Sequence, residues 1–277
     1  MDYFADLETT VANALSEDVG DGDITAQLVV AETQASGRVI SRQTAIICGR
    51  PWVDEVARQV DPGIDIDWLV AEGHQARPND ILFRISGTAR SLLTAERTML
   101  NFLQTLSGTA TRTRQYVELI RDHPATLLDT RKTIPGLRLA QKYAVKTGGA
   151  ENHRIGLFDA FLIKENHIQA AGSITAAVSA AREISAGARI EVEVENETEL
   201  TEAIKAAPDW IMLDNFTTVQ MARAVGQVRG SGIRLEASGG IENDEELIRI
   251  AATGVDYISL GTITKHCEAV DLSMRFE

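Results

Sequence analysis

Hydrophobic residues recur at helical spacing at the start of the chain. They are Phe4, Leu7, Val11 and Leu15. This spacing predicts a helix that ends before the turn-forming Gly and Asp residues at 20–23. Short β-rich runs follow, with a helix predicted over 51–60 because proline favours the first helical turn. The predicted strands are 38–41, 45–48, 64–68 and 81–85. Because helices and strands mix here without strict alternation, we expect an α+β sandwich domain.

A strongly amphipathic stretch at 89–106 predicts the next helix. Its apolar side consists of Leu92, Leu93, Met99, Leu100, Leu103 and Leu106. We expect Gly108 to break this helix before a second helical stretch that continues to Ile120. A domain boundary is therefore expected near residue 107.

Beyond residue 122 the pattern changes to short β-rich runs separated by helical ones. The six predicted strands are 126–129, 160–164, 190–194, 210–214, 233–237 and 256–260, and a seventh is expected at 143–145. Strands that alternate with helices form a parallel sheet, and so many in succession favour an α/β barrel over an open doubly wound sheet. A GxGxxG fingerprint does not follow the first of these strands, which argues against a dinucleotide-binding fold.

These patterns predict a two-domain α/β protein. We expect an N-terminal α/β sandwich domain over 1–107 and an α/β barrel domain over 108–265. The C-terminal tail, 266–277, is expected to pack back on the N-terminal domain.

Polar residues or glycines stand at the carboxyl end of nearly every predicted barrel strand. They are Asp129, Thr130 and Arg131, then Lys164, Glu193 to Glu195, Asp214 and Asn215, Ser238, Gly239 and Gly240, and Gly261 and Thr262. Barrel enzymes build their active sites at this edge. We therefore expect the functional site there.

Charge is distributed unevenly along the chain, whose formal net charge is −13. The window 131–164 holds seven Lys or Arg against Glu151 and Asp159, so it carries +5 and the remainder −18. Such a cluster of cations suits a small polyanionic ligand, because a cleft lined by one sign of charge concentrates the opposite ion. The acidic pI of about 4.9 makes nucleic acid an unfavourable partner.

The first residues and the two cysteines bear on compartment and redox state. The acidic first residues lack an apolar signal region, and apolar runs stay far below membrane-spanning length, so we expect a cytoplasmic protein with no membrane partner. Cys48 and Cys267 are isolated in the sequence. We expect both to be reduced thiols without a chemical role.

Three carboxylates alternate with valines at Glu191, Glu193 and Glu195 and so point to one side of a strand. Three unpaired charges could not be buried in a barrel, so we expect at least the later two at its open rim, with Glu193 in the site. Asp214 is either a site residue or the N-cap of the helix expected near Thr217.

The glycine loops and the remaining candidates allow more than one interpretation. Ser238 to Gly240 and the loop at Gly261 offer backbone N–H groups to a phosphate. Arg97 is, by pattern alone, a solvated or ion-paired helix residue. His153 and His167 lack metal-ligand spacing, and a histidine beside an arginine is as often a structural donor as a base.

The residues in and around this window closely resemble those of quinolinate phosphoribosyltransferases of the decarboxylating type. The shared positions are Asp129 to Arg138, Gly148 and Gly149, Asn152 to Arg154, Lys164 to Ile168, Leu15 to Asp18, Glu96, Arg97, Asn101, Gln104, Glu191 to Glu195, Leu213 to Asn215 and Asp271 to Arg275. The resemblance covers essentially the whole chain. It departs at Ala150, where we expect glycine in many relatives.

The resemblance implies a fold, an assembly and a reaction. The fold is an N-terminal sandwich domain followed by an incomplete, seven-stranded α/β barrel, in at least a homodimer whose sites lie at the subunit interface. The reaction transfers phosphoribose from 5-phosphoribosyl-1-pyrophosphate to quinolinate, which releases pyrophosphate and CO2 and gives nicotinate mononucleotide for NAD synthesis.

The resemblance also implies roles for single residues. Quinolinate binding falls to Arg131, His153, Arg154, Lys164 and Arg97 of the partner subunit. The residues implied to bind phosphoribosyl pyrophosphate are Lys132, Glu193, Asp214, Ser238, Gly239, Gly240 and Gly261. The implied Mg2+ ligands are Glu193 and Asp214. The implied catalytic residues are Lys132, Lys164, Glu193 and Asp214.

Other functions stay open at this point. A related branch associated with molybdate transport shares the scaffold, and nicotinate phosphoribosyltransferases act on a monocarboxylate, although the number of cations favours a dicarboxylate. Lys164 at a strand end could instead form the Schiff base of an aldolase. A non-catalytic anion-binding protein would not need Glu193 and Asp214 together.

Overall fold

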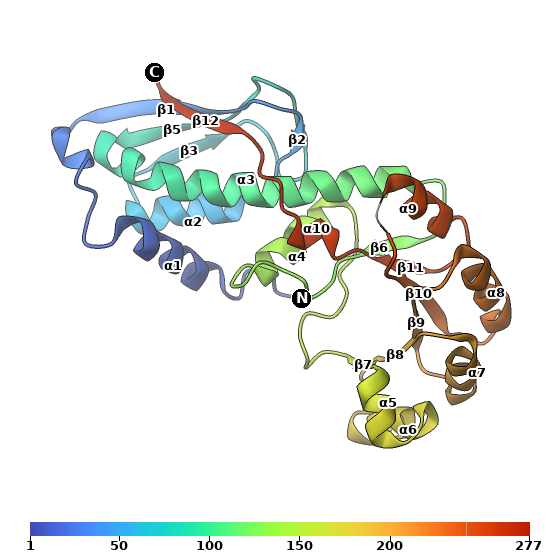
Figure 1. Cartoon of the computed structure of the whole chain (residues 1–277). Helices are drawn as coiled ribbons and strands as arrows, with labels where there is room; N and C mark the ends of the chain where they lie inside the picture. Colours follow the sequence, from blue (N-terminus) through green and yellow to red (C-terminus); the bar gives the residue numbers. More distant parts are fainter. Residues whose placement is uncertain (242) are drawn as a thin grey trace. The chain divides into compact units, whose positions relative to one another are not determined.

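The computed structural model describes residues 1–241 and 243–277 and divides into two compact units (Figure 1). Unit 1 comprises Met1–Arg114, Thr133–Gly149 and Thr262–Glu277, and unit 2 comprises Gln115–Lys132 and Ala150–Gly261. The expected boundary at residue 107 therefore lies within unit 1, before its first border at Arg114. The segment Thr133–Gly149 also groups with the N-terminal residues, whereas the sequence pattern predicts it in the barrel.

Unit 1 is built on a four-stranded antiparallel sheet in the order β12-β1-β5-β3. Its members are β1 (Gln34–Ser41), β3 (Asp65–Trp68), β5 (Ile81–Thr88) and β12 (Leu272–Phe276), and a separate pair consists of β2 (Ala45–Ile46) and β4 (Gln75–Ala76). The strands predicted at 38–41, 45–48, 64–68 and 81–85 are confirmed as β1, β2, β3 and β5. The C-terminal strand β12 pairs with β1, with Val39 opposite Met274.

The helices of unit 1 bury their apolar sides in one core with this sheet. They are α1 (Leu7–Val19), the 3-10 turn η1 (Ala26–Leu28), α2 (Arg50–Val60), α3 (Ala89–Leu119, whose last residues belong to unit 2), α4 (Arg138–Gly148) and α10 (Thr262–Lys265). The core includes Val11, Trp52, Phe83, Leu103 and Leu106, all fully buried. The opening helix and the helix at 51–60 are confirmed.

Two predictions about this part of the chain are wrong. Gly108 does not break a helix, because α3 runs without interruption through it. A Cβ atom there would meet the carbonyl oxygen of Glu268, so glycine allows the C-terminal segment to pass close to the helix. The seventh strand expected at 143–145 is part of α4, where Ala140, Ala144 and Val145 are buried with helical periodicity.

Unit 2 is a parallel sheet of six strands, each of which was predicted. They are β6 (Thr126–Leu128), β7 (Phe161–Ile163), β8 (Ile190–Val194), β9 (Trp210–Asp214), β10 (Arg234–Ser238) and β11 (Tyr257–Ser259). The helices between them are α5 (Glu165–Ala171), α6 (Ile174–Ile184), α7 (Glu197–Ala206), α8 (Thr218–Val228) and α9 (Asp244–Ala251) (Figure 1).

The strand order shows that the sheet closes into an incomplete barrel. The order is β6-β11-β10-β9-β8-β7, so the first strand pairs with the last, and the gap lies between β6 and β7. On that side of β6 a single parallel bridge joins Leu128 to Glu151. Over the described residues the barrel therefore has six strands and one bridge rather than the seven strands that we expected.

None of the helices in the described ranges is both long enough and apolar enough to cross a membrane.

Candidate active site

A pocket of about 520 Å³ opens at the carboxyl ends of the barrel strands in unit 2. Its lining consists of Thr130, Arg131, Lys132, His153, Arg154, Leu162, Lys164, Glu193, Met212, Asp214, Glu236, Ser238 and Ser259. Most of the residues predicted for the site are thereby brought together. The edge predicted from the ends of the strands is the edge that holds the pocket.

Strand periodicity places the acidic and apolar wall of the pocket. Along a strand, alternate side chains point to the same face, so Glu191 and Glu193 on β8 face inward together. In the parallel register Glu193 pairs with Met212 of β9, and Met212 pairs with Glu236 of β10. One row of side chains across three strands therefore carries two carboxylates with a thioether between them.

Two arginines approach the pocket from loops rather than from strands. Arg131 follows β6, and Arg154 follows the bridge at Glu151 and donates from its guanidinium to the carbonyl of Ala160 at 3.3 Å. Burial lowers the pKa of Arg154, and the positive charge of Arg131 lowers it further. The two like charges are thus close enough to repel, and a bound anion would relieve this repulsion.

Lys164 and Glu193 form an ion pair at the mouth of the pocket. The Lys164 Nζ lies 2.5 Å from Glu193 Oε2, and the backbone N–H of Lys164 is held by Nδ1 of His167 at 3.1 Å. This pairing engages the Lys164 Nζ with a carboxylate of the neighbouring strand. Glu195, two residues further along, is exposed, as predicted.

His153 projects into a buried acidic cluster below the cations. Its Nε2 lies 2.9 Å from Glu191 Oε2 and 3.3 Å from Glu236 Oε2, and both glutamates are fully buried. Its Nδ1 accepts the backbone N–H of Arg154 at 2.7 Å. Both ring nitrogens are therefore engaged by protein groups, so His153 supports the floor of the pocket.

Burial and neighbouring charges shift the pKa values of His153 and Glu191. Burial lowers the pKa of His153 but its two glutamate partners outweigh this and raise it to about 9. The N–H of Arg154 opposes a second ring proton, because it already occupies the Nδ1 lone pair. Burial, followed by the charge of Glu236, raises the pKa of Glu191 to about 7.

The glycine loops lie where the strand ends predict them. Gly239 and Gly240 have positive φ angles of 80° and 66°, which glycine adopts without strain, directly after Ser238. Gly261 lies against Lys132, since a Cβ atom there would stand 2.9 Å from the lysine Cδ. These loops leave backbone close to the pocket, as a phosphate site requires.

The alternative role for Asp214 is ruled out by the helix that follows it. The N-cap of α8 is Thr217, whose side chain accepts the backbone N–H of Gln220. In turn, Oε1 of Gln220 accepts the backbone N–H of Thr217. Asp214 instead lines the pocket and accepts from Nδ2 of Asn215 at 2.9 Å.

Some lining residues were not predicted, and four predicted residues, Gly239, Gly240, Gly261 and Arg97, are not among the described lining residues. Glu236, Met212, Leu162 and Ser259 line the pocket, and the alternation of Glu236 with Ser238 was a usable signal for the first of these. Glu191 is buried through its pairing with His153, a compensation that the strand pattern does not reveal. Arg97 lies exposed on α3 of unit 1 and is not among the described residues that line this pocket.

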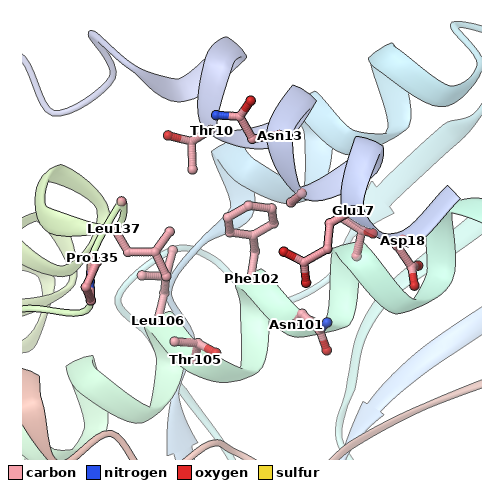
Figure 2. A pocket seen from close by; sticks show the side chains of 13 residues that line it. Thr10, Asn13, Glu17, Asp18, Asn101, Phe102, Thr105, Leu106, Pro135 and Leu137 are labelled. Carbon is pink, nitrogen blue, oxygen red and sulfur yellow. The ribbon is translucent and has the colours of Figure 1, made fainter. Parts of the chain in front are cut away.

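A second pocket, of about 350 Å³, lies within unit 1 (Figure 2). Side chains of α1 and α3 face it, together with residues 135–137, and two of the lining residues, Glu17 and Asp18, are acidic (Figure 2). None of its described lining residues is a lysine or an arginine. It therefore does not suit an anionic ligand, whereas the barrel pocket does.

Comparison with known proteins gives one consistent family. The model described as the C-terminal domain of quinolinate phosphoribosyl transferase matches residues 109–275, and the model of the N-terminal domain matches residues 23–107. A probable nicotinate-nucleotide pyrophosphorylase (carboxylating) from Synechocystis is 43% identical over 94% of this chain and 89% of its own length.

Two further relatives agree with this match. A quinolinate phosphoribosyltransferase (decarboxylating) from Nicotiana glauca is 35% identical over 98% of this chain and 83% of its own length. The solved structure of the nicotinate-nucleotide pyrophosphorylase from Francisella tularensis superposes with a TM-score of 0.94 at 49% identity, covering 98% of this chain and 96% of that one. With both domain models matched and the barrel pocket in place, the chain belongs to the quinolinate phosphoribosyltransferase family.

Proposed function

We propose that this protein transfers the phosphoribosyl group of 5-phosphoribosyl-1-pyrophosphate to quinolinate, with loss of CO2, in the synthesis of NAD. The products are nicotinate mononucleotide and pyrophosphate. The names of the relatives support this activity. The observation that carries it is one pocket lined by Arg131, Lys132, Arg154 and Lys164 together with Glu193 and Asp214.

Quinolinate carries two adjacent carboxylates and needs several fixed cations. The planar guanidinium of arginine can bind a carboxylate through two parallel hydrogen bonds, and Arg131 and Arg154 enter the pocket as a pair. Lys164 adds a third charge, and we propose Arg97 of the partner subunit as a fourth. Both nitrogens of His153 bind protein groups, so we propose that it contributes by holding the chain beside Arg154.

Phosphoribosyl pyrophosphate would occupy the side of the pocket near the late strands. Lys132 provides the charge there, and Ser238, Gly239, Gly240 and Gly261 leave backbone N–H groups within reach of its phosphates.

The donor set of the pocket fits Mg2+, which we propose as the cofactor. Glu193 and Asp214 are carboxylates, and a Mg2+ ion that keeps water and phosphate oxygens needs only one or two such ligands. Glu193 uses Oε2 for Lys164, which leaves Oε1 for a cation. When bound, the ion would neutralise charge on the departing pyrophosphate.

The residues of the chain act mainly by position and charge. As the bond between C1 of the ribose and pyrophosphate breaks, positive charge develops on the sugar, and the carboxylates of Glu193 and Asp214 in the same pocket would stabilise it. The ring nitrogen of quinolinate then bonds to C1. The cations hold the second carboxylate until it leaves as CO2, and a proton takes its place on the ring carbon.

We also propose an assembly and a compartment. A homodimer would bring Arg97 of the partner subunit to the barrel pocket, because Arg97 is exposed on α3 rather than in the lining. Cys48 and Cys267 are both free thiols, which is usual in the reducing cytoplasm, where we place the protein.

One assay tests the proposed function. Purified protein is incubated with quinolinate, phosphoribosyl pyrophosphate and Mg2+, and CO2 release and nicotinate mononucleotide are followed. We expect turnover of quinolinate but not of nicotinate, because the missing carboxylate would leave a partly buried cation unpaired. Equal turnover of nicotinate, or turnover that survives a chelator, would contradict the proposal. Borohydride with a ketose phosphate should trap nothing on Lys164.

A further inference from the structure

Asp129 is fully buried at the end of β6, and its carboxylate binds the segment that carries two pocket residues. Its Oδ1 accepts the backbone N–H of His153 at 2.9 Å. Its Oδ2 accepts Nδ2 of Asn152 at 2.7 Å. Asp129 itself is not among the described residues that line the pocket, so it acts on the site through its neighbours.

The backbone around Asp129 shows why a side chain is needed there. Residue Glu151 pairs with the end of β6, donating its N–H to the carbonyl of Leu127 at 2.9 Å and accepting the N–H of Asp129 at 3.3 Å. This pairing is a single bridge at the open edge of the barrel. Beyond this bridge the backbone pairing ends, and the carboxylate of Asp129 instead holds the next two residues, Asn152 and His153, by hydrogen bonds.

The two chain segments that Asp129 joins each lead to an arginine of the pocket. Arg131 lies two residues after Asp129, and Arg154 directly follows His153. Both guanidinium groups line the same pocket, where burial and then the like charge of Arg131 lower the pKa of Arg154. Without a restraint the loops would separate in the empty site, and the cost of ordering them would fall on ligand binding.

We propose that Asp129 is a positioning residue that holds Arg131 and Arg154 at the spacing required by the two carboxylates of the substrate. This inference rests on the proposed function and adds a division of labour to it. Asp129 sets the half of the site that binds the aromatic acid. Ser238 to Gly240, on the proposed phosphate side, follow a different strand, β10, and we expect them to depend on Asp129 less.

The test is Asp129→Asn. An asparagine has one acceptor oxygen and turns an amide N–H toward the second donor, so one of the two hydrogen bonds is lost. We expect the KM for quinolinate to rise roughly 10- to 100-fold, the range of a lost charged hydrogen bond, while the KM for phosphoribosyl pyrophosphate changes less than about threefold. Calorimetric titration with quinolinate alone should show the same loss in affinity.

A reciprocal swap separates positioning from general damage. In the double variant Asp129→Asn with Asn152→Asp, the amide and the carboxylate exchange places. The amide introduced at position 129 can then accept from the N–H of His153 and donate to the carboxylate introduced at position 152. We expect the KM for quinolinate to return most of the way to the wild-type value. Asp209→Asn is the matched control, because Asp209 likewise accepts a backbone N–H, from Ile190 at 2.7 Å, but at the amino end of β9.

The outcomes distinguish this inference from the proposed function. If wild-type protein does not convert quinolinate, the function is wrong. If it does, but a folded Asp129→Asn variant keeps the wild-type KM for quinolinate, or raises both KM values equally, the positioning role is wrong. Failure of the swap to recover the KM, with a melting temperature equal to that of the wild type, would overturn it as well.

Discussion

The ammonium group of Lys164 lies 2.5 Å from the carboxylate of Glu193, across two neighbouring strands of the barrel. The lysine side chain is 41% exposed, whereas the glutamate side chain is 10% exposed. Each residue thus supplies the other with a counter-charge while the pocket is open. We propose that the substrates take over both roles, with quinolinate binding the lysine and the pyrophosphate, through its metal ion, engaging the glutamate.

Removal of a cation from the pocket should therefore be costly. We expect Lys164→Ala and Arg131→Ala each to lower kcat/KM for quinolinate by roughly 10²–10³-fold, because each deletes a charged contact that we propose for the substrate. Steady-state kinetics with both substrates varied provides the measurement. Lys205→Ala, which removes an exposed lysine from α7, is the control and should keep its activity. Near-normal turnover by either site variant would show that the pocket has been assigned wrongly.

Much of the fold follows from local pattern, because strands and helices differ in periodicity. The six barrel strands were recognisable from short apolar runs, and their polar ends located the site. Two errors share a physical cause. Gly108 and residues 143–145 were interpreted from local preference, but packing against Glu268 and burial of one face of α4 decided the outcome.

The site was predictable to the extent that its residues stand at strand ends. Asp129 was expected only as one of several polar residues at a strand end, and Glu236 was not predicted although it alternates with Ser238, because the importance of both comes from partners far away in sequence. Glu236 meets His153 across the barrel, and Asp129 binds Asn152, 23 positions along the chain. A single sequence offers no signal for such pairings, whereas the resemblance identified the residues that we propose to touch substrate.

Stability should depend on pH through Glu55, which is nearly buried on α2. Hydrogen bonds from Arg58 lower the pKa of Glu55 below its ordinary value of 4.5, against a smaller opposing effect of burial. A lowered folded-state pKa means that the stabilisation is fully present above pH 4.5 and is lost as the pH falls through the folded value. We expect Glu55→Gln to destabilise the protein by roughly 0.5–1.5 kcal/mol near pH 7 and by much less near pH 3.

Urea unfolding at the two pH values measures this difference. For Arg58→Gln, the difference in stability from the wild type should likewise become smaller at low pH, because this variant removes the partner that lowers the pKa of Glu55. If the free energies of unfolding of Glu55→Gln and wild type differed as much at low pH as at neutral pH, the ion pair would not be the source of the difference.

Replacing two helical glycines by alanine should change the stability of the protein in opposite directions. In Gly108→Ala the new methyl group would meet the carbonyl oxygen of Glu268, so α3 or the C-terminal segment must shift, and we expect a loss of roughly 1–3 kcal/mol. In Gly226→Ala, within α8, the methyl group meets nothing within 4 Å, and we expect a gain of about 0.5–1 kcal/mol. Denaturant midpoints of the two variants should therefore lie on opposite sides of the wild type. A neutral Gly108→Ala would show that the close approach is not required.

The last prediction concerns Arg97, which is exposed on α3 and which we propose to act in the partner subunit. Arg97→Ala and Arg131→Ala should each be nearly inactive alone. If the sites are shared across a two-fold interface, a mixed dimer has one site lacking both arginines and one site lacking neither. Random mixing of equal amounts gives half mixed dimers, so activity should recover to about a quarter of the wild-type value. If Arg97 acted within its own chain, every site in the mixture would remain defective. A mixed dimer verified by differential tagging that stayed inactive would therefore refute the shared site, while leaving the assignment of the reaction intact.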